Sequence, residues 1–219
     1  MFSNFDLHTF VIGLIVVVLS ITLHEFGHAI SADLLGDDTP RRQGRITLWP
    51  DKHFDMLGFL LIVFSSLAGF GIGYGKPVQV NPARLRHPNR DMILITACGP
   101  LMNLLLAIVF GLVMRIADAT GHSAWLDSQS LSYMFVYQFL FRNLGLMFFN
   151  LIPIYPLDGS KILYGILPAR NANAYDSFMR QWSPILFMVI LCSGSALIGP
   201  ILTPAITTTA RIITGLSWQ

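Results

Sequence analysis

Long apolar runs alternate with short polar links along the whole chain. A helix that crosses about 30 Å of hydrocarbon needs about 20 mostly apolar residues. Three runs have this length and predict spanning helices over residues 7–32, 92–116 and 131–150. The chain is therefore expected to be a polytopic membrane protein with these three helices as its core.

Two further apolar stretches are ambiguous by pattern. Residues 56–73 end in a glycine cluster, and glycine and prolines interrupt the segment at about 183–217. The first is compatible with a crossing or a re-entrant segment, and the second with one broken span or a hairpin. Irregular backbone is tolerated at membrane depth where it is buried in protein. Both stretches are expected to be membrane-embedded.

Composition and charge support this class. Of 219 residues, 53% are hydrophobic and 12% are charged, which is far from a soluble domain. Lys and Arg gather in the links at 41–52, 76–90 and 161–180 and are absent from 117–130. Because cytoplasmic loops carry the excess of basic residues, the first, second and fourth links are expected inside and the third outside. Both flanks of 56–73 are then cytoplasmic, which favours re-entry.

The first predicted helix carries His24, Glu25 and His28 within an apolar run. Residues four apart share a helix face, so the two imidazoles can bind one metal ion beside a carboxylate that can accept a proton. Ionisable groups at membrane depth are costly and therefore indicate function. We predict a catalytic site of the HExxH type with one zinc ion per chain.

A catalytic zinc ion takes three protein ligands and keeps one position for water. Asp158 is the best candidate for the third ligand, because it follows the helix predicted at 131–150 in a Pro-Leu-Asp-Gly turn. Asp-Gly is also a common turn pair that needs no metal. On spacing alone, His53, Asp33 and Asp55 therefore remain alternatives.

The first polar link contains an alternating segment bounded by glycine and proline, which predicts a short edge strand. Such a strand can bind an extended peptide through main-chain hydrogen bonds. The candidate substrate-binding residues are Gly44, Arg45, Ile46, Thr47 and Leu48. Asn103 is either a further substrate contact or a polar link between helices. His53 is expected to be an ordinary loop histidine, and Arg142 has no assigned role.

The expected fold is an all-α polytopic membrane protein with a re-entrant or β-hairpin segment after the first helix. Residues 1–219 are expected to form a single membrane-embedded domain, with its core at about 7–167 and a C-terminal membrane segment at about 183–217.

Three strings of the chain, taken in order, resemble the signatures of a known family. They are His24-Glu25-Phe-Gly-His28, Gly99-Pro-Leu-Met-Asn103 and Asn150-Leu-Ile-Pro-Ile-Tyr-Pro-Leu-Asp158-Gly159. Together they look like the site-2 protease family of intramembrane zinc metalloproteases, and the resemblance covers about residues 22–167. The link at 117–130 is too short for a PDZ domain and no terminal extension could hold a CBS domain, so the small branch without them is expected. Met56 departs from this branch, in which proline is expected.

The resemblance implies a role for each matched residue. His24, His28 and Asp158 would hold zinc, Glu25 would be the catalytic base, and Asn150 would position the substrate or stabilise the intermediate. The segment after the metal helix would pair with the substrate. The implied activity is hydrolysis of peptide bonds within or near transmembrane segments of membrane proteins, as in regulated intramembrane proteolysis. The implied location is a prokaryotic cell membrane, with the active site toward the cytoplasm.

Two other functions match part of the pattern. A catalytically silent relative would bind or sort membrane proteins, but it would not need to keep Glu25, the only glutamate of the chain. A metal transporter would need ionisable residues on several spans, and they are lacking. The lipid bilayer and substrates with a transmembrane segment are the expected partners, and nucleic acid is not expected.

Overall fold

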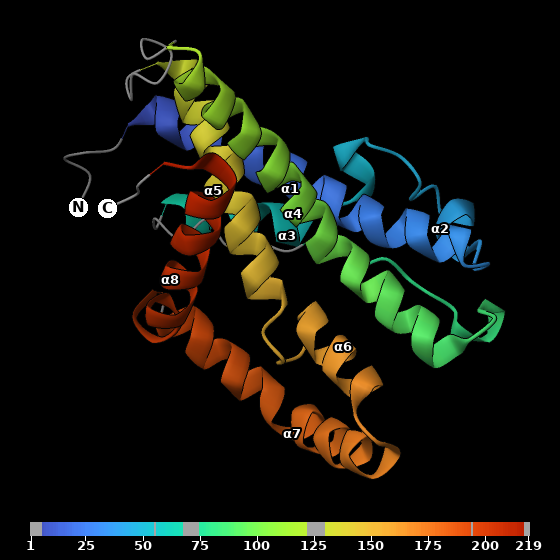
Figure 1. Ribbon diagram of the computed structural model, residues 1–219. Helices are drawn as coiled ribbons and strands as arrows, with labels where there is room; N and C mark the ends of the chain where they lie inside the picture. Colours follow the sequence, from blue (N-terminus) through green and yellow to red (C-terminus); the bar gives the residue numbers. More distant parts are fainter. Residues whose placement is uncertain (1–5, 55, 68–74, 122–129, 194, 217–219) are drawn as a thin grey trace.

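The computed structural model describes residues 6–54, 56–67, 75–121, 130–193 and 195–216, in which all regular structure is helical (Figure 1). The helices are α1 (Leu7–Leu34), α2 (Thr39–Arg42), α3 (Met56–Leu67), α4 (Pro88–Ala119), α5 (Leu131–Asn150), α6 (Asp158–Ile166), α7 (Ala169–Ser193) and α8 (Ser195–Thr214), with 3-10 turns η1 (Pro50–Lys52) and η2 (Pro82–Arg84). The all-α membrane class is confirmed.

The three predicted core helices are present as α1, α4 and α5. Asp6 caps α1, since its carboxylate accepts hydrogen bonds from the amides of His8 and Thr9 at 3.1 Å each. Helix α4 begins earlier than predicted, at Pro88, because proline is favoured in the first turn of a helix, where its missing N–H has no partner to lose.

Within the described residues, the helices long and apolar enough to cross a membrane are α1, α4 and the part of α8 from Ala196 to Thr214. Helix α5 has the length of a span, 20 residues, but contains several polar side chains. Of these, Gln138 and Asn143 are buried. These two amides therefore lie inside the bundle, whereas Ser132 and Tyr137 of the same helix are exposed.

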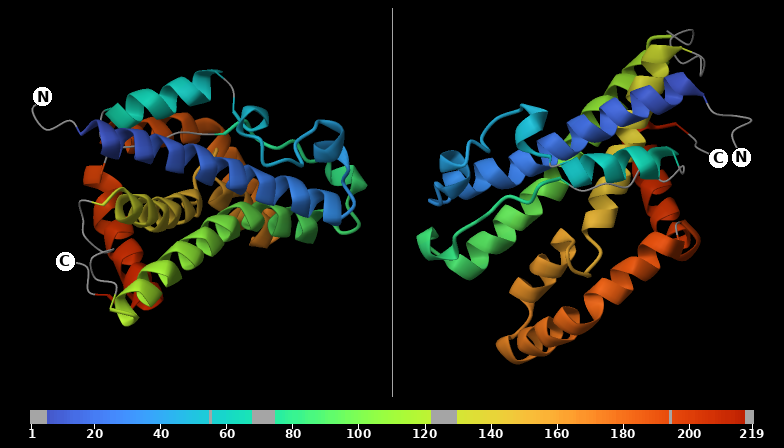
Figure 2. Two further views of the ribbon diagram at one scale, coloured as in Figure 1. Left: turned by 90° about the horizontal axis from the view of Figure 1, so that it is seen from above. Right: turned by 180° about the vertical axis from the view of Figure 1, so that it is seen from behind.

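The stretch predicted to re-enter begins as α3, which has 12 residues. At 1.5 Å per residue this helix is about 18 Å long, too short to cross about 30 Å of hydrocarbon. The remainder of that prediction, including the glycine cluster at 68–74, lies outside the described residues. Helix α3 runs beside α1 (Figure 2).

The strand predicted at residues 45–48 is wrong, as is the β-hairpin. This segment has no regular structure and its peptide groups are bonded locally. The amide of Arg45 donates to the Pro40 carbonyl at 2.9 Å, and the Thr47 carbonyl lies 2.8 Å from Nε2 of His53. Alternation of polar and apolar residues predicts which side chains share a face, but a strand also needs main-chain hydrogen bonds to a neighbouring strand. In this segment, local hydrogen bonds take their place.

Helices α1, α4 and α5 pack against one another, while α8 packs against α4 and α5 (Figure 1). The core shared by α4, α5 and α8 contains Ala107, Met114, Leu140, Leu144 and Ala210. The C-terminal region forms two helices, α7 and α8, rather than one broken span, and α7 already begins at Ala169.

Asp37 joins the link after α1 to the chain that follows α3. Its side chain is fully buried and accepts hydrogen bonds from the Thr39 amide at 3.0 Å and the Asn81 amide at 2.6 Å. Burial alone would raise the pKa of Asp37, but the hydrogen bonds from Thr39 and Asn81 outweigh it and lower the pKa. The carboxylate thus holds two segments together beside the end of α1.

Candidate metal centre

Helices α1 and α6 bring His24, His28 and Asp158 into one buried cluster. Oδ2 of Asp158 lies 3.1 Å from Nε2 of His24 and 3.2 Å from Nε2 of His28. The two Nε2 atoms are 3.1 Å apart. The spacing of four residues on α1 places both rings on one face, and the loop after α5 delivers the aspartate to the same point.

Hydrogen bonds on the far side of each ring fix its tautomer. Nδ1 of His24 lies 2.7 Å from Oδ1 of Asn103, and Nδ1 of His28 lies 2.8 Å from the Ile95 carbonyl. Because both partners are acceptors, each Nδ1 carries the hydrogen and each Nε2 presents a lone pair to the cluster.

Three electron-rich atoms therefore converge in a buried space. Oδ2 of Asp158 has no hydrogen-bond partner among the described residues. Two imidazole lone pairs and a carboxylate oxygen repel one another unless a cation lies between them, and this set of nitrogen and oxygen ligands is typical of catalytic zinc. The three residues can hold a metal ion.

The backbone of α4 approaches the cluster at Gly99. A Cβ atom on Gly99 would lie 2.3 Å from Nε2 of His28 and 2.7 Å from Cε1 of His24. On the facing helix, a Cβ on Gly27 would lie 2.8 Å from the Cys98 carbonyl oxygen. Small residues thus let α1 and α4 pack closely at the level of the cluster.

Asp158 is the first residue of α6 and follows a tight loop. A Cβ on Gly159 would lie 2.2 Å from the carbonyl oxygen of Leu151, so a side chain there would collide with the loop. The glycine after the aspartate is therefore needed for the path that presents Asp158 to the histidines.

Helix α7 holds the loop between α5 and α6 in place through hydrogen bonds. The Tyr155 hydroxyl donates to Oδ1 of Asp176 at 3.0 Å, and Nε of Arg180 donates to Oδ2 of Asp176 at 2.7 Å. The Tyr175 hydroxyl donates to the Pro153 carbonyl at 2.9 Å. Burial and the neighbouring Asp176 carboxylate raise the pKa of Tyr155 to about 12, so it remains a donor at neutral pH.

Glu25 lies beside the cluster on α1 and is also buried. Its Oε2 is 3.7 Å from Nη2 of Arg45. On another side, a Cβ on Gly75 would lie 3.0 Å from its Oε1. Burial lowers the pKa of Arg45, and the Glu25 carboxylate opposes this effect. The candidate base thus sits between a buried guanidinium and the main chain that follows α3.

The other predicted residues lie outside the three-residue cluster. The Asn150 side chain donates to the Leu146 carbonyl of its own helix at 2.9 Å. Of the alternative ligands, Asp33 pairs with Arg41 and Asp55 is outside the described residues. His53 lies in the loop before α3, outside the cluster, and is fully buried there. The polarity of the link concealed this burial.

Of the remaining candidates, Leu48 is exposed, whereas Gly44 turns the chain with φ +65° and Thr47 bonds to His53. Ile46 is partly buried.

Asn103 acts as a polar link between helices. It is fully buried, contacts His24 and donates through Nδ2 to Oδ1 of Asn143 at 2.8 Å. Asn143 in turn donates to Oγ of Ser20 at 2.8 Å. The sequence pattern gives no role to Asn143 or Ser20, although an asparagine inside an apolar run indicates a polar contact with a neighbouring helix.

Replacing Asn103 with leucine is expected to weaken zinc binding by about 10–100-fold, because His24 would lose the partner that fixes its tautomer. Competition with a chromogenic chelator measures the affinity. Leu101→Ala is the matched control, since Leu101 lies on the same helix with an exposed side chain. Equal affinities in wild type and Asn103→Leu would contradict this role.

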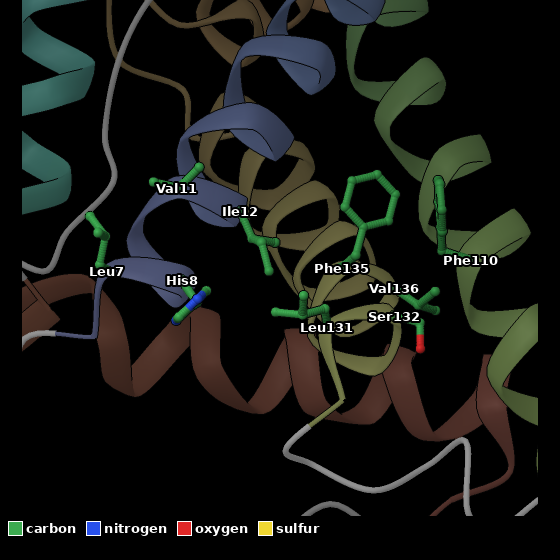
Figure 3. A pocket seen from close by; sticks show the side chains of 9 residues that line it. All are labelled: Leu7, His8, Val11, Ile12, Phe110, Leu131, Ser132, Phe135 and Val136. Atoms are coloured by element: carbon green, nitrogen blue, oxygen red, sulfur yellow. The ribbon is translucent and has the colours of Figure 1, made fainter.

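A separate apolar cavity of about 730 Å³ lies near the start of α1 (Figure 3). Its lining comes from α1, α4 and α5 and consists of Leu7, His8, Val11, Ile12, Phe110, Leu131, Ser132, Phe135 and Val136. Ile12 and His24 are separated by about 18 Å along the helix. The cavity holds no group of metal ligands, so the chemistry is assigned to the histidine and aspartate cluster.

The family model described as Peptidase family M50 matches residues 113–193, which include Asp158 but not the two histidines. YwhC of Bacillus subtilis, named as a candidate zinc metalloprotease, is 33% identical over 190 residues, which cover 86% of this chain and 84% of YwhC. The chain belongs to peptidase family M50, the site-2 protease family. The resemblance seen in the three strings is confirmed.

Two further relatives are also named as candidate zinc metalloproteases. Rip2 of Mycolicibacterium smegmatis is 28% identical over 179 residues, covering 80% of this chain and 64% of Rip2. MJ0611 of Methanocaldococcus jannaschii is 27% identical over 198 residues, which cover 90% of this chain and 82% of MJ0611. No solved structure matches the chain. Family membership makes this chain a metalloprotease of the membrane with zinc as its cofactor.

Proposed function

We propose that this M50 chain is an intramembrane zinc endopeptidase, which hydrolyses peptide bonds within or near transmembrane segments of membrane proteins. The observation that carries the proposal is the convergence of His24, His28 and Asp158 in a buried cluster. Two of the helices around it, α1 and α4, are candidate membrane spans. A hydrolytic metal site among such helices would act on chains that lie in the bilayer.

His24, His28 and Asp158 would hold the zinc ion through two nitrogens and one oxygen. When bound, zinc supplies a Lewis acid for the scissile carbonyl and acidifies a water. The Glu25 carboxylate would accept a proton from the attacking water and return it to the leaving amine. Its burial next to the histidines supports this role, because a base must lie within reach of the proton that it takes.

The substrate would lie along residues 44–48, with its scissile bond near Glu25. Arg45 of this segment approaches Glu25, which supports the placement even though the segment is not a strand. The Asn150 carboxamide would turn from the Leu146 carbonyl to a substrate carbonyl and stabilise its developing charge. The basic links before and after α3 support a cytoplasmic active site.

Removal of zinc tests the proposal. A purified chain in detergent micelles should cleave a reporter protein with one transmembrane helix and tagged ends. We expect 1,10-phenanthroline to abolish cleavage and added zinc, but not magnesium, to restore it. Cleavage that continues after zinc has been removed would contradict the proposal. Zinc binding without cleavage would favour the alternative, a silent binding or sorting factor of the same fold.

A further inference from the structure

Arg45 is a buried cation whose position is unusual for a residue of a polar link. Its side chain is only 5% exposed. Burying a guanidinium is costly unless charges and hydrogen bonds compensate for the loss of water. The contacts of Arg45 therefore indicate why the fold retains it inside.

The guanidinium reaches across from one chain segment to another. Nη1 donates to the Pro77 carbonyl at 3.3 Å, and Nη2 donates to the Lys76 carbonyl. Nη2 also lies 3.7 Å from Oε2 of Glu25, which is an electrostatic contact longer than a hydrogen bond. Among the described residues, neither Nε of Arg45 nor Oε2 of Glu25 has a hydrogen-bond partner.

The segment that Arg45 holds also confines Glu25 directly. A Cβ on Gly75, the residue before Lys76, would lie 2.9 Å from Cγ of Glu25. His53 fastens the same main chain, since its carbonyl accepts a hydrogen bond from the Lys76 amide at 2.7 Å. Any displacement of residues 75–77 would therefore change the space available to the carboxylate.

We propose that Arg45 is a positioning residue for Glu25. Its charge attracts one carboxylate oxygen, and its hydrogen bonds fix the main chain that limits the carboxylate on another side. Because the backbone of Arg45 belongs to the segment proposed to receive the substrate, docking of the substrate and orientation of the base become coupled. This inference rests on the proposed role of Glu25 in catalysis.

Kinetics of Arg45→Met and Arg45→Lys test the proposal on the reporter with one transmembrane helix. We expect Arg45→Met to lower kcat by about 100-fold, the usual effect of misplacing a catalytic group by about 1 Å, with zinc content retained and KM within about twofold. Arg45→Lys should recover part of kcat, because it keeps the charge but not the fork of hydrogen bonds. A higher KM with unchanged kcat would overturn the proposal in favour of substrate docking alone.

Gln43→Ala is the matched control. Gln43 joins the same two segments through a hydrogen bond from Nε2 to Oε1 of Gln79 at 2.7 Å, but on the exposed surface and away from Glu25. Its kcat should equal that of the wild type. If Gln43→Ala lowers kcat as much as Arg45→Met, the loss of any contact between the two segments impairs catalysis. That result would overturn the specific role of Arg45.

A double-mutant cycle on thermal unfolding tests the coupling without any activity assay. The shift in Tm caused by Arg45→Met, which removes the charge, should differ between the wild type and Glu25→Gln, since contacting groups are not additive. Equal shifts would overturn the proposal. If Glu25→Gln keeps full activity but the shifts differ, the proposed catalytic function fails while the contact between the two residues stands.

Discussion

Glu25→Gln is expected to lower the rate of peptide-bond cleavage by about 10²–10⁴-fold, the range attributed to a general acid or base. Glutamine has nearly the same shape but cannot take a proton from water. The three metal ligands remain intact, so zinc content should equal that of the wild type. Single-turnover cleavage of the membrane reporter, together with zinc analysis of the same sample, measures both effects.

Asp51→Asn is the control for this change, because it removes a carboxylate from an exposed position of the first polar link. It should cleave the reporter at the wild-type rate. Full activity of Glu25→Gln would contradict the hydrolytic mechanism. It would favour a chain that binds or sorts membrane proteins without cutting them.

Gly99→Ala is expected to reduce zinc affinity by about 100-fold or more, at or beyond the upper end of the effects seen when groups that support ligands are replaced. The added methyl carbon would sit 2.3 Å from Nε2 of His28, where a metal-binding lone pair points. Either α4 must move away from α1 or the imidazole must rotate, and each change separates the ligands. Titration with zinc in the presence of a competing chelator measures the loss.

Gly145→Ala provides the comparison on a neighbouring helix. A Cβ there would meet Ile206 at 4.0 Å, which is an ordinary contact. Zinc affinity should therefore stay at the wild-type level in Gly145→Ala. Unchanged affinity in Gly99→Ala would mean that α4 does not approach the metal ligands as closely as described.

The sequence predicts the main helices because their signal is local. Apolar runs of sufficient length define α1, α4 and α5, and the spacing of His24 and His28 places both rings on one face. The prediction that Asp158 joins them rests on its position after a helix and on the family resemblance. The sequence could not exclude Asp33 or His53 by spacing, because the link that holds them has no periodicity that reveals where it folds.

Contacts between distant segments could not be predicted. Alternation at residues 45–48 resembles a strand, yet the side chain of Arg45 turns inward toward Glu25 and no ladder forms. The approach of Gly99 to the histidines and the bonds of Asn143 to Asn103 and Ser20 exist only once α1, α4 and α5 pack together. These roles depend on packing between helices, which single-sequence patterns do not encode.

Zinc content of the purified Asp158→Ala chain tests the central claim most directly. Asp33→Ala is the paired control, because Asp33 is a rejected candidate ligand that instead accepts a hydrogen bond from Arg41 at 2.7 Å. The wild type and Asp33→Ala should each bind one zinc ion per chain, whereas Asp158→Ala should bind almost none. Full zinc content in Asp158→Ala would contradict a site shared by α1 and the start of α6.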